Sequence, residues 1–238
     1  FTLAVLAASG IMVISGPISS AILPRMSRLH AEGKHNELIQ LYNNATQLVS
    51  VIAGSASIVI AFSAQPLLYA WTGSSEIASQ TSPILRLYAI GNGFLAVSAF
   101  PYYLQYALGN LRYHLIGNAV MVVVLIPAII VAATYFGAVG AGYVWLSVNG
   151  LYMVTWVGYV HHKLEPGLHW GWLTKNITSI YVPVSLVLGV VSMVGIEHPT
   201  RLAALVYVVG LSVLALIVGI ISSSYMRSLI KIRLSGSK

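Results

Sequence analysis

The chain has 238 residues, of which 58% are hydrophobic and only 7% are charged, with a formal net charge of +7. Soluble domains carry about 25% charged residues, so this composition excludes an ordinary soluble domain and indicates a polytopic membrane protein. The apolar runs are much longer than the alternating ~10-residue segments of a membrane β-barrel. We therefore predict an all-α bundle of transmembrane helices.

Seven apolar segments are long enough to cross a bilayer. In chain order they cover 1–23, 43–64, 82–108, 115–135, 139–161, 178–196 and 202–224. Phe1 already lies inside an apolar run, and no charged residue precedes it, so this start does not fit a signal peptide. We expect that an N-terminal part of the protein is missing from the chain.

The longest polar stretch runs from Pro24 to Tyr42, between the first two apolar segments. It contains Arg25, Arg28 and Lys34 together with two of the five acidic residues. We predict that the first span ends at Pro24 and that the polar stretch forms a loop. Leucine and isoleucine side chains within it favour a short amphipathic surface helix.

Basic residues are distributed unequally between the two sides of the predicted bundle. One side holds ten of the twelve, namely Arg25, Arg28, Lys34, Arg112, Lys163, Lys175, Arg227, Lys231, Arg233 and Lys238. The other side has Arg201, with Arg86 inside the third span near that side. Because cytoplasmic loops are enriched in Lys and Arg, we predict a cytoplasmic C-terminus and an external Phe1. The net positive charge therefore does not indicate nucleic-acid binding.

The residues that usually hold metals or perform covalent catalysis are scarce. The chain has no cysteine and no aspartate, and its five glutamates lie in predicted loops or at span ends. Its seven histidines show no Cys/His spacing of a metal site. We expect no metal, no cofactor and no enzymatic activity.

The third apolar segment, 82–108, is the most polar of the seven. At 100° per residue, one side of it carries a group of polar residues within about 60° of one another: Tyr88, Asn92, Tyr103 and Tyr106. Arg86 lies on nearly the opposite side, about one turn from the outer end of the span. Pro101 interrupts the segment, so residue counting does not fix the helical phase of Tyr103 and Tyr106 relative to Tyr88 and Asn92. The fifth segment also carries a polar and aromatic stripe at helical spacing: Trp145, Asn149, Tyr152, Trp156 and Tyr159.

Several short motifs, in order, resemble one transporter family. They are LPRMSRLHAEGKHNELIQLY at 23–42, LLYAWTG at 67–73, YAIGNGF at 88–94, PYYLQYALGN at 101–110, YFGAVGAGYVW at 135–145 and HWGWLTKNI at 169–177. Together they resemble the Wzx-type polysaccharide flippases of the multidrug/oligosaccharidyl-lipid/polysaccharide exporter superfamily. The resemblance implies spans eight to fourteen of a fourteen-span, two-lobe protein. Residues 1–162 would then form five spans of the C-terminal transport lobe, and residues 163–238 two additional spans and a cytoplasmic tail.

The resemblance also implies a function. Such flippases move undecaprenyl-diphosphate-linked oligosaccharides across the bacterial inner membrane, by alternating access, for O-antigen, lipopolysaccharide or other surface polysaccharide. The partners implied are the lipid-linked oligosaccharide, membrane lipids and the polysaccharide polymerase machinery. A diphosphate headgroup needs cationic or hydrogen-bonding groups in a water-filled cavity.

Five residues are the candidates for substrate binding: Arg86, Asn92, Tyr103, Gln105 and Asn149. Each has a structural alternative, because an arginine can extend its charge to the interface and polar amides can join helices. At the cytoplasmic connection, Pro24 and Ser27 belong to the motif, and Arg25 and Arg28 are candidates for attracting the headgroup. Orienting the loop is an alternative role for these two arginines.

Three other functions compete with the flippase interpretation. A drug or small-molecule antiporter of the same superfamily usually couples to ions through a buried carboxylate, and this chain has none inside a predicted span. A metal-dependent membrane glycosyltransferase or polymerase requires paired aspartates, which are absent. A seven-helix receptor with a retinal Schiff base requires a lysine inside a span, and no predicted span contains one.

Overall fold

The computed structural model describes residues 1–195 and 200–235, and over these residues it consists of helices and turns without any strand. Its helices are α1 (Thr2–Ala31), α2 (His35–Val49), α3 (Ser55–Phe62), α4 (Ala64–Thr72), α5 (Ser75–Ser98), α6 (Phe100–Ala107), α7 (Arg112–Leu151), α8 (Val157–Leu164), α9 (Leu168–Trp172), α10 (Ser179–Met193), α11 (Arg201–Ser222) and α12 (Ser224–Ser235). Short π-helical segments at Ser50–Gly54, Tyr152–Trp156 and Leu173–Thr178 join α2 to α3, α7 to α8 and α9 to α10. The predicted all-α membrane bundle is confirmed.

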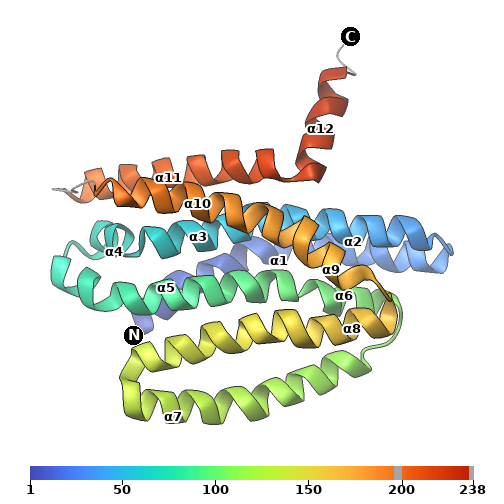
Figure 1. Cartoon of the computed structure of the whole chain (residues 1–238), viewed down its shortest axis with the longest axis horizontal. Coiled ribbons are helices and arrows are strands. Elements are labelled where there is room, and N and C mark those ends of the chain that lie inside the picture. Colours follow the sequence, from blue (N-terminus) through green and yellow to red (C-terminus); the bar gives the residue numbers. More distant parts are fainter. Residues whose placement is uncertain (196–199, 236–238) are drawn as a thin grey trace.

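Within the described ranges, six continuous helical runs are long and apolar enough to cross a membrane. One of them, Arg112–Leu164, has 53 residues, which at 1.5 Å per residue far exceeds the ~30 Å apolar core of a bilayer. At Gly137 its backbone leaves the helical region, with φ 63° and ψ −155°, and the chain reverses there into two antiparallel arms (Figure 1). Counting both arms, the described chain has seven apolar arms, as the sequence predicts.

The prediction that the first span ends at Pro24 is wrong. Helix α1 continues through Pro24 to Ala31, and the connection to α2 is a tight turn at 32–34. Met26 and Leu29 in this extension are buried, whereas Arg25 and Arg28 are exposed. The helix therefore continues past Pro24 because burial of its apolar side outweighs the low helix propensity of proline.

Two other predicted breaks are also largely helical. Most of 65–80 belongs to α4 and α5, which are separated by a turn in which Gly73 has φ 75° and Ser74 caps α5. The predicted loop 163–176 is reduced to a short turn before α9. Because α5 begins at Ser75, Arg86 lies about three helical turns from its start, not one. The predicted interruption near Pro101 is confirmed, since α5 ends at Ser98 and α6 begins at Phe100.

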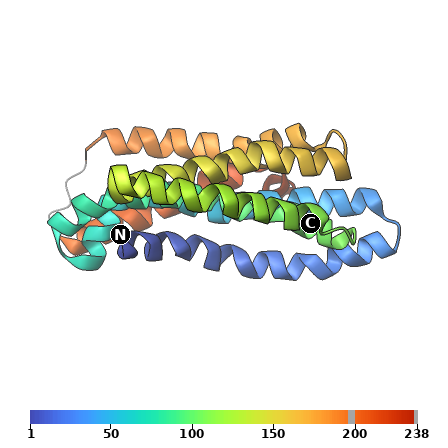
Figure 2. The ribbon, with the colours of Figure 1, turned by 90° about the horizontal axis from the view of Figure 1, so that it is seen from below.

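Helix α5 is central to the bundle and packs against α1, α3, α4 and α7. Helices α10 and α11 pack against each other and against α3. Figure 2 shows α1 and α10 on opposite sides of the α7 hairpin. The largest buried cluster includes Tyr42, Phe100, Leu104 and Trp172, which come from α2, α6 and α9.

The turns after α1, α6 and α8 lie at one end of the bundle, and the turn after α4 and the reversal at Gly137 lie at the other (Figure 1). At the first of these ends, His35 Nε2 lies 2.7 Å from a Glu165 carboxylate oxygen. This contact joins the turn between α1 and α2 to the turn after α8. Most described basic residues are at that end. The predicted turn at 197–201 lies mostly outside the described residues, as does Lys238.

Candidate functional site

Two adjoining cavities lie between α10 and the helices α3 to α5. The first has a volume of about 930 Å³ and the second about 380 Å³. Ala61, Phe62 and Ile90 line both, so the two cavities are neighbours, and together we call them the groove. We refer to them as the polar and apolar compartments of the groove, from the side chains described below.

The polar compartment is at the end of the bundle that contains the α4–α5 turn. Arg86 of α5 lines it together with polar side chains from α5 itself and from three other helices, α4, α10 and α11: Gln65, Tyr69, Ser75, Ser192 and Tyr207. Among the described residues that line either compartment, Arg86 carries the only charge. Its side chain is exposed, and within the described chain no hydrogen bond or ion pair engages it. The guanidinium is therefore available to an anionic ligand.

The apolar compartment extends from the shared residues toward the middle of the bundle. It is lined mainly by hydrophobic side chains, among them Ile58, Phe94, Met153, Val182 and Leu186. A groove with a cationic, hydrogen-bonding end and a hydrophobic end suits an amphiphile with an anionic headgroup.

Tyr181 fixes the position of α10 beside this groove. Its hydroxyl donates to the Gly93 carbonyl at 2.9 Å, and its ring stacks on Phe94 with 6.3 Å between ring centroids. A Cβ on Gly54 would lie 2.2 Å from the Tyr181 ring, so the glycine is needed for this approach. Gly54, the last residue of the π-helical segment before α3, thus allows α10 to pack closely.

Asn92, a sequence candidate, joins helices and does not line the groove. Its Nδ2 donates to the Ala8 carbonyl at 2.9 Å, and its Oδ1 accepts from Trp145 Nε1 at 3.0 Å. Asn92 is buried, and these bonds connect α5 to α1 and to α7.

Replacing Asn92 with alanine is expected to lower the melting temperature of the purified protein by roughly 3–8 °C. Hydrogen bonds between membrane helices are worth about 0.6 kcal/mol on average, and loss of the amide removes two of them and leaves the Trp145 indole N–H without its partner. Intrinsic tryptophan fluorescence during heating measures the change. Asn118→Ala is the matched control, because its amide bonds only to His114 on the same exposed surface. An unchanged melting temperature for Asn92→Ala would contradict the joining role.

The other three sequence candidates in the spans also lie outside the groove lining. Gln105 donates to the Pro101 carbonyl at 3.2 Å and accepts from the His114 amide at 2.7 Å, which fastens α6 to the start of α7. Asn149 is buried and donates to the Trp145 carbonyl at 2.8 Å. Tyr103 is half-buried, with edge contacts to neighbouring rings. Of the five candidates, the structure places only Arg86 in the groove.

Sequence analysis missed most of the polar residues of the groove. Gln65 and Tyr69 are one helical turn apart, a spacing that indicates a shared face only once 64–72 is known to be a helix. Tyr181 shows no signal in the sequence, because its partner Gly93 is 88 residues away.

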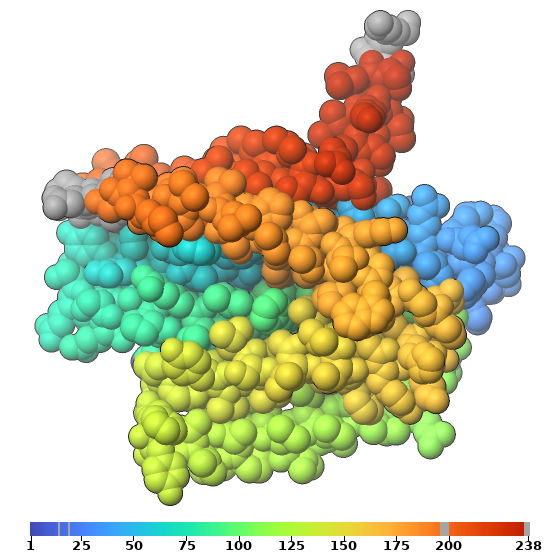
Figure 3. All heavy atoms as spheres, in the orientation of Figure 1, coloured from blue at the N-terminus to red at the C-terminus, as the bar shows by residue number. Residues whose placement is uncertain are grey.

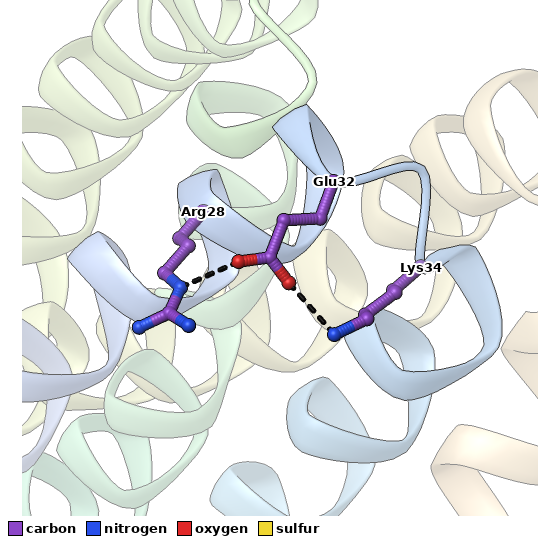
Figure 4. Close-up of polar contacts among 3 residues, drawn as sticks. All are labelled: Arg28, Glu32 and Lys34. Carbon is purple, nitrogen blue, oxygen red and sulfur yellow. Dashed lines mark hydrogen bonds and ion pairs between the residues drawn. The ribbon is translucent and has the colours of Figure 1, made fainter.

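The four motif residues Pro24, Arg25, Ser27 and Arg28 belong to the last part of α1, at the end of the bundle opposite the α4–α5 turn. Glu32 accepts a hydrogen bond from Arg28 Nε at 2.6 Å and lies 2.9 Å from Lys34 Nζ (Figure 4). These contacts, from Lys34 first and then Arg28, lower the pKa of Glu32 to about 2, so its carboxylate is ionised throughout the physiological pH range. Pro24 and Ser27 are within α1, where the Ser27 hydroxyl donates to the Leu23 carbonyl, and Arg25 is exposed.

A buried cluster of aromatic and histidine side chains connects α2, α8 and α9. The Tyr42 hydroxyl is 2.7 Å from His161 Nε2, and His161 Nδ1 is 3.1 Å from His169 Nδ1. Trp172 Nε1 donates to the Thr46 hydroxyl at 3.1 Å. Among the described residues, no group of three or more potential metal ligands is present. The cluster fastens α9 to the helices that precede it.

Comparison with known proteins identifies one family. The family model described as "Lipid II flippase MurJ" matches residues 3–228, which is nearly the whole chain. No curated protein and no solved structure matches the chain.

Proposed function

Because the chain belongs to the lipid II flippase MurJ family, we propose that it translocates a lipid-linked peptidoglycan precursor of the lipid II class across the membrane. The match over residues 3–228 is the observation that carries this proposal. This family match confirms the resemblance to flippases of lipid-linked substrates, but not to the polysaccharide subclass. The narrower prediction of an O-antigen oligosaccharide now becomes the second candidate, supported by the motifs at 23–42 and 169–177.

The groove supports a substrate with a charged headgroup and a long apolar chain. In this proposal Arg86 binds a phosphate oxygen of the headgroup, and the polar side chains around it hydrogen-bond to the sugar. The prenyl chain occupies the apolar compartment, where it replaces contacts with membrane lipid. Asn92 acts by joining α5, which lines the groove, to α1 and α7, and Gln105 fastens α6 to α7. Asn149 and Tyr103 make their polar and ring contacts within their own helices.

The topology proposed with this function follows the charge distribution. The end of the bundle with the turns after α1, α6 and α8 faces the cytoplasm of a bacterial inner membrane, and so does the C-terminus. Residues 1–162 belong to one transport lobe, and residues 163–238 add two spans and a tail. Movement of this lobe against a second lobe would give alternating access. Interaction with polysaccharide polymerase machinery stays a prediction.

Complementation of two bacterial strains tests this proposal with the full-length protein that contains this chain. In a strain depleted of its own lipid II flippase, we expect expression of the protein to restore growth and to lower the accumulation of lipid II. In a strain without its polysaccharide flippase, we expect no return of surface polysaccharide. The opposite pair of results, at matched expression, would replace the first candidate with the second.

A further inference from the structure

Helix α12 leaves the bundle in a direction unlike that of any other helix. Figures 1 and 3 show it projecting crosswise from the end of α11, and none of its residues is buried. The bend occurs at Ser223, whose backbone is extended with φ −78° and ψ 122°. Because α11 is a membrane-spanning helix, α12 starts where the chain emerges from the apolar core and turns toward the plane of the membrane.

The direction of α12 is fixed by Gln47 of α2. The Gln47 Oε1 atom accepts hydrogen bonds from the Ser223 hydroxyl at 2.7 Å, the Ser224 hydroxyl at 3.2 Å and the Tyr225 amide at 3.0 Å. Its Nε2 donates to Asn176 Oδ1 at 3.0 Å, and this connects the bend to the helix before α10. A side chain 176 residues away in sequence therefore holds the α11–α12 bend.

Helix α12 is amphipathic. At 100° per residue, its polar side combines Arg227 and Lys231 with three serines, Ser224, Ser228 and Ser235. The rest of its circumference is mainly apolar. Tyr225 and Met226, next to the bend, are half-buried, and the four apolar residues beyond them are exposed: Leu229, Ile230, Ile232 and Leu234. Ile232 is 66% exposed and Leu234 71% exposed, which is unfavourable in water. Arg233 interrupts the apolar side with a side chain long enough to bring its charge back to the interface.

Charge identifies the surface that covers this apolar side. From Ser224 to the end of the chain there are four basic residues and no acidic residue. A second copy of α12 would bring like charges together, whereas an anionic lipid leaflet supplies both the opposite charge and the apolar layer beneath it. Each basic residue near such a surface favours binding by roughly fivefold.

We propose that α12 is an interfacial helix that lies in the headgroup layer of an anionic leaflet, with Gln47 setting its angle to α11. Its apolar side faces the acyl chains, and Arg227 and Lys231 bind lipid phosphates. The anchor is distinct from the substrate groove, since it lies at the opposite end of α11 from Tyr207 and the polar compartment.

Single cysteines introduced into this cysteine-free chain test the proposal. Ser228→Cys and Ile230→Cys are two residues apart and lie about 160° apart around the helix, so they form a matched pair. Each is labelled with an environment-sensitive fluorophore, and the protein is reconstituted in phosphatidylcholine vesicles with or without about 30% phosphatidylglycerol. Quenching by iodide, which is soluble in water, measures exposure of the label.

In anionic vesicles we expect quenching at Ile230→Cys to be at least about threefold weaker than at Ser228→Cys. Adding the changes Arg227→Gln, Lys231→Gln and Arg233→Gln, or removing phosphatidylglycerol, should reduce the difference in iodide quenching between the two labelled positions. Gln47→Leu should also reduce the contrast, with unchanged tryptophan fluorescence as the check on folding. Equal quenching at both positions in anionic vesicles would overturn the proposal. Protection of Ile230→Cys that is the same in anionic lipid, neutral lipid and detergent would also overturn it, because that result indicates a protein partner.

Discussion

Replacing Arg86 with alanine in the full-length protein is expected to abolish rescue of a strain depleted of its lipid II flippase. Arg86 is the one charged residue among the described residues that line the groove, and within the described chain it has no partner that would explain it as structural. A hydrogen bond to a charged group is worth about 1.5–3 kcal/mol, so substrate binding should weaken by roughly 10- to 100-fold. Growth rescue and direct binding of the lipid substrate measure the two effects.

The conservative variant separates charge from geometry at this site. Arg86→Lys keeps the positive charge but loses the planar pair of donors, so we expect partial rescue. Arg112→Ala is the control, because Arg112 is also exposed but begins α7 at the other end of the bundle. If Arg86→Ala rescues growth fully at normal expression, Arg86 has no role in headgroup binding, and the groove needs another ligand group.

Replacing Gly137 with alanine is expected to lower the melting temperature by roughly 3–10 °C. With φ 63° and ψ −155°, this residue occupies a region that is essentially restricted to glycine, and other residues there cost about 1–3 kcal/mol. Space is not the obstacle, since no atom lies within 4 Å of an added Cβ. The backbone conformation that reverses the chain between two membrane-spanning arms is the obstacle.

Two other glycines make this measurement interpretable. At Gly140, an added Cβ would lie 2.5 Å from the Ala132 carbonyl oxygen across the reversal, so Gly140→Ala should destabilise the protein by direct collision. Gly210 lies within α11, and no atom is within 4 Å of its added Cβ, so Gly210→Ala should not lower the melting temperature and should raise it slightly through the better helix propensity of alanine. If Gly137→Ala has the same melting temperature as the wild type, the packing of the two arms does not depend on the backbone conformation at residue 137.

The groove depends on packing that sequence periodicity does not show. Helical periodicity placed Tyr88 and Asn92 on the opposite side of their helix from Arg86, and the structure agrees: both are buried against α1 or α7, and Arg86 faces the groove. Periodicity did not show which of the two sides faces a cavity. That depends on where α10 packs, and Tyr181 and Gly54 determine its position.

The sequence by itself determined the class of the protein. Its high apolar content, its long uncharged segments and its unequal basic residues were sufficient for an all-α membrane bundle with seven arms, because each span must satisfy its own backbone hydrogen bonds in lipid. Short motifs were sufficient for a lipid-linked flippase, although they favoured the polysaccharide subclass over the family that matches the chain.

Only the tertiary structure decided where helices continue and which polar groups join them. Helix α1 passes Pro24 because Met26 and Leu29 are buried by neighbours that a local pattern does not reveal. Asn92 is paired with a carbonyl 84 residues away, and Gln47 with a hydroxyl 176 residues away. A buried polar side chain in a membrane protein can bind substrate or join helices, and its type and spacing are the same in both cases. The position of its partner in three dimensions decides between them.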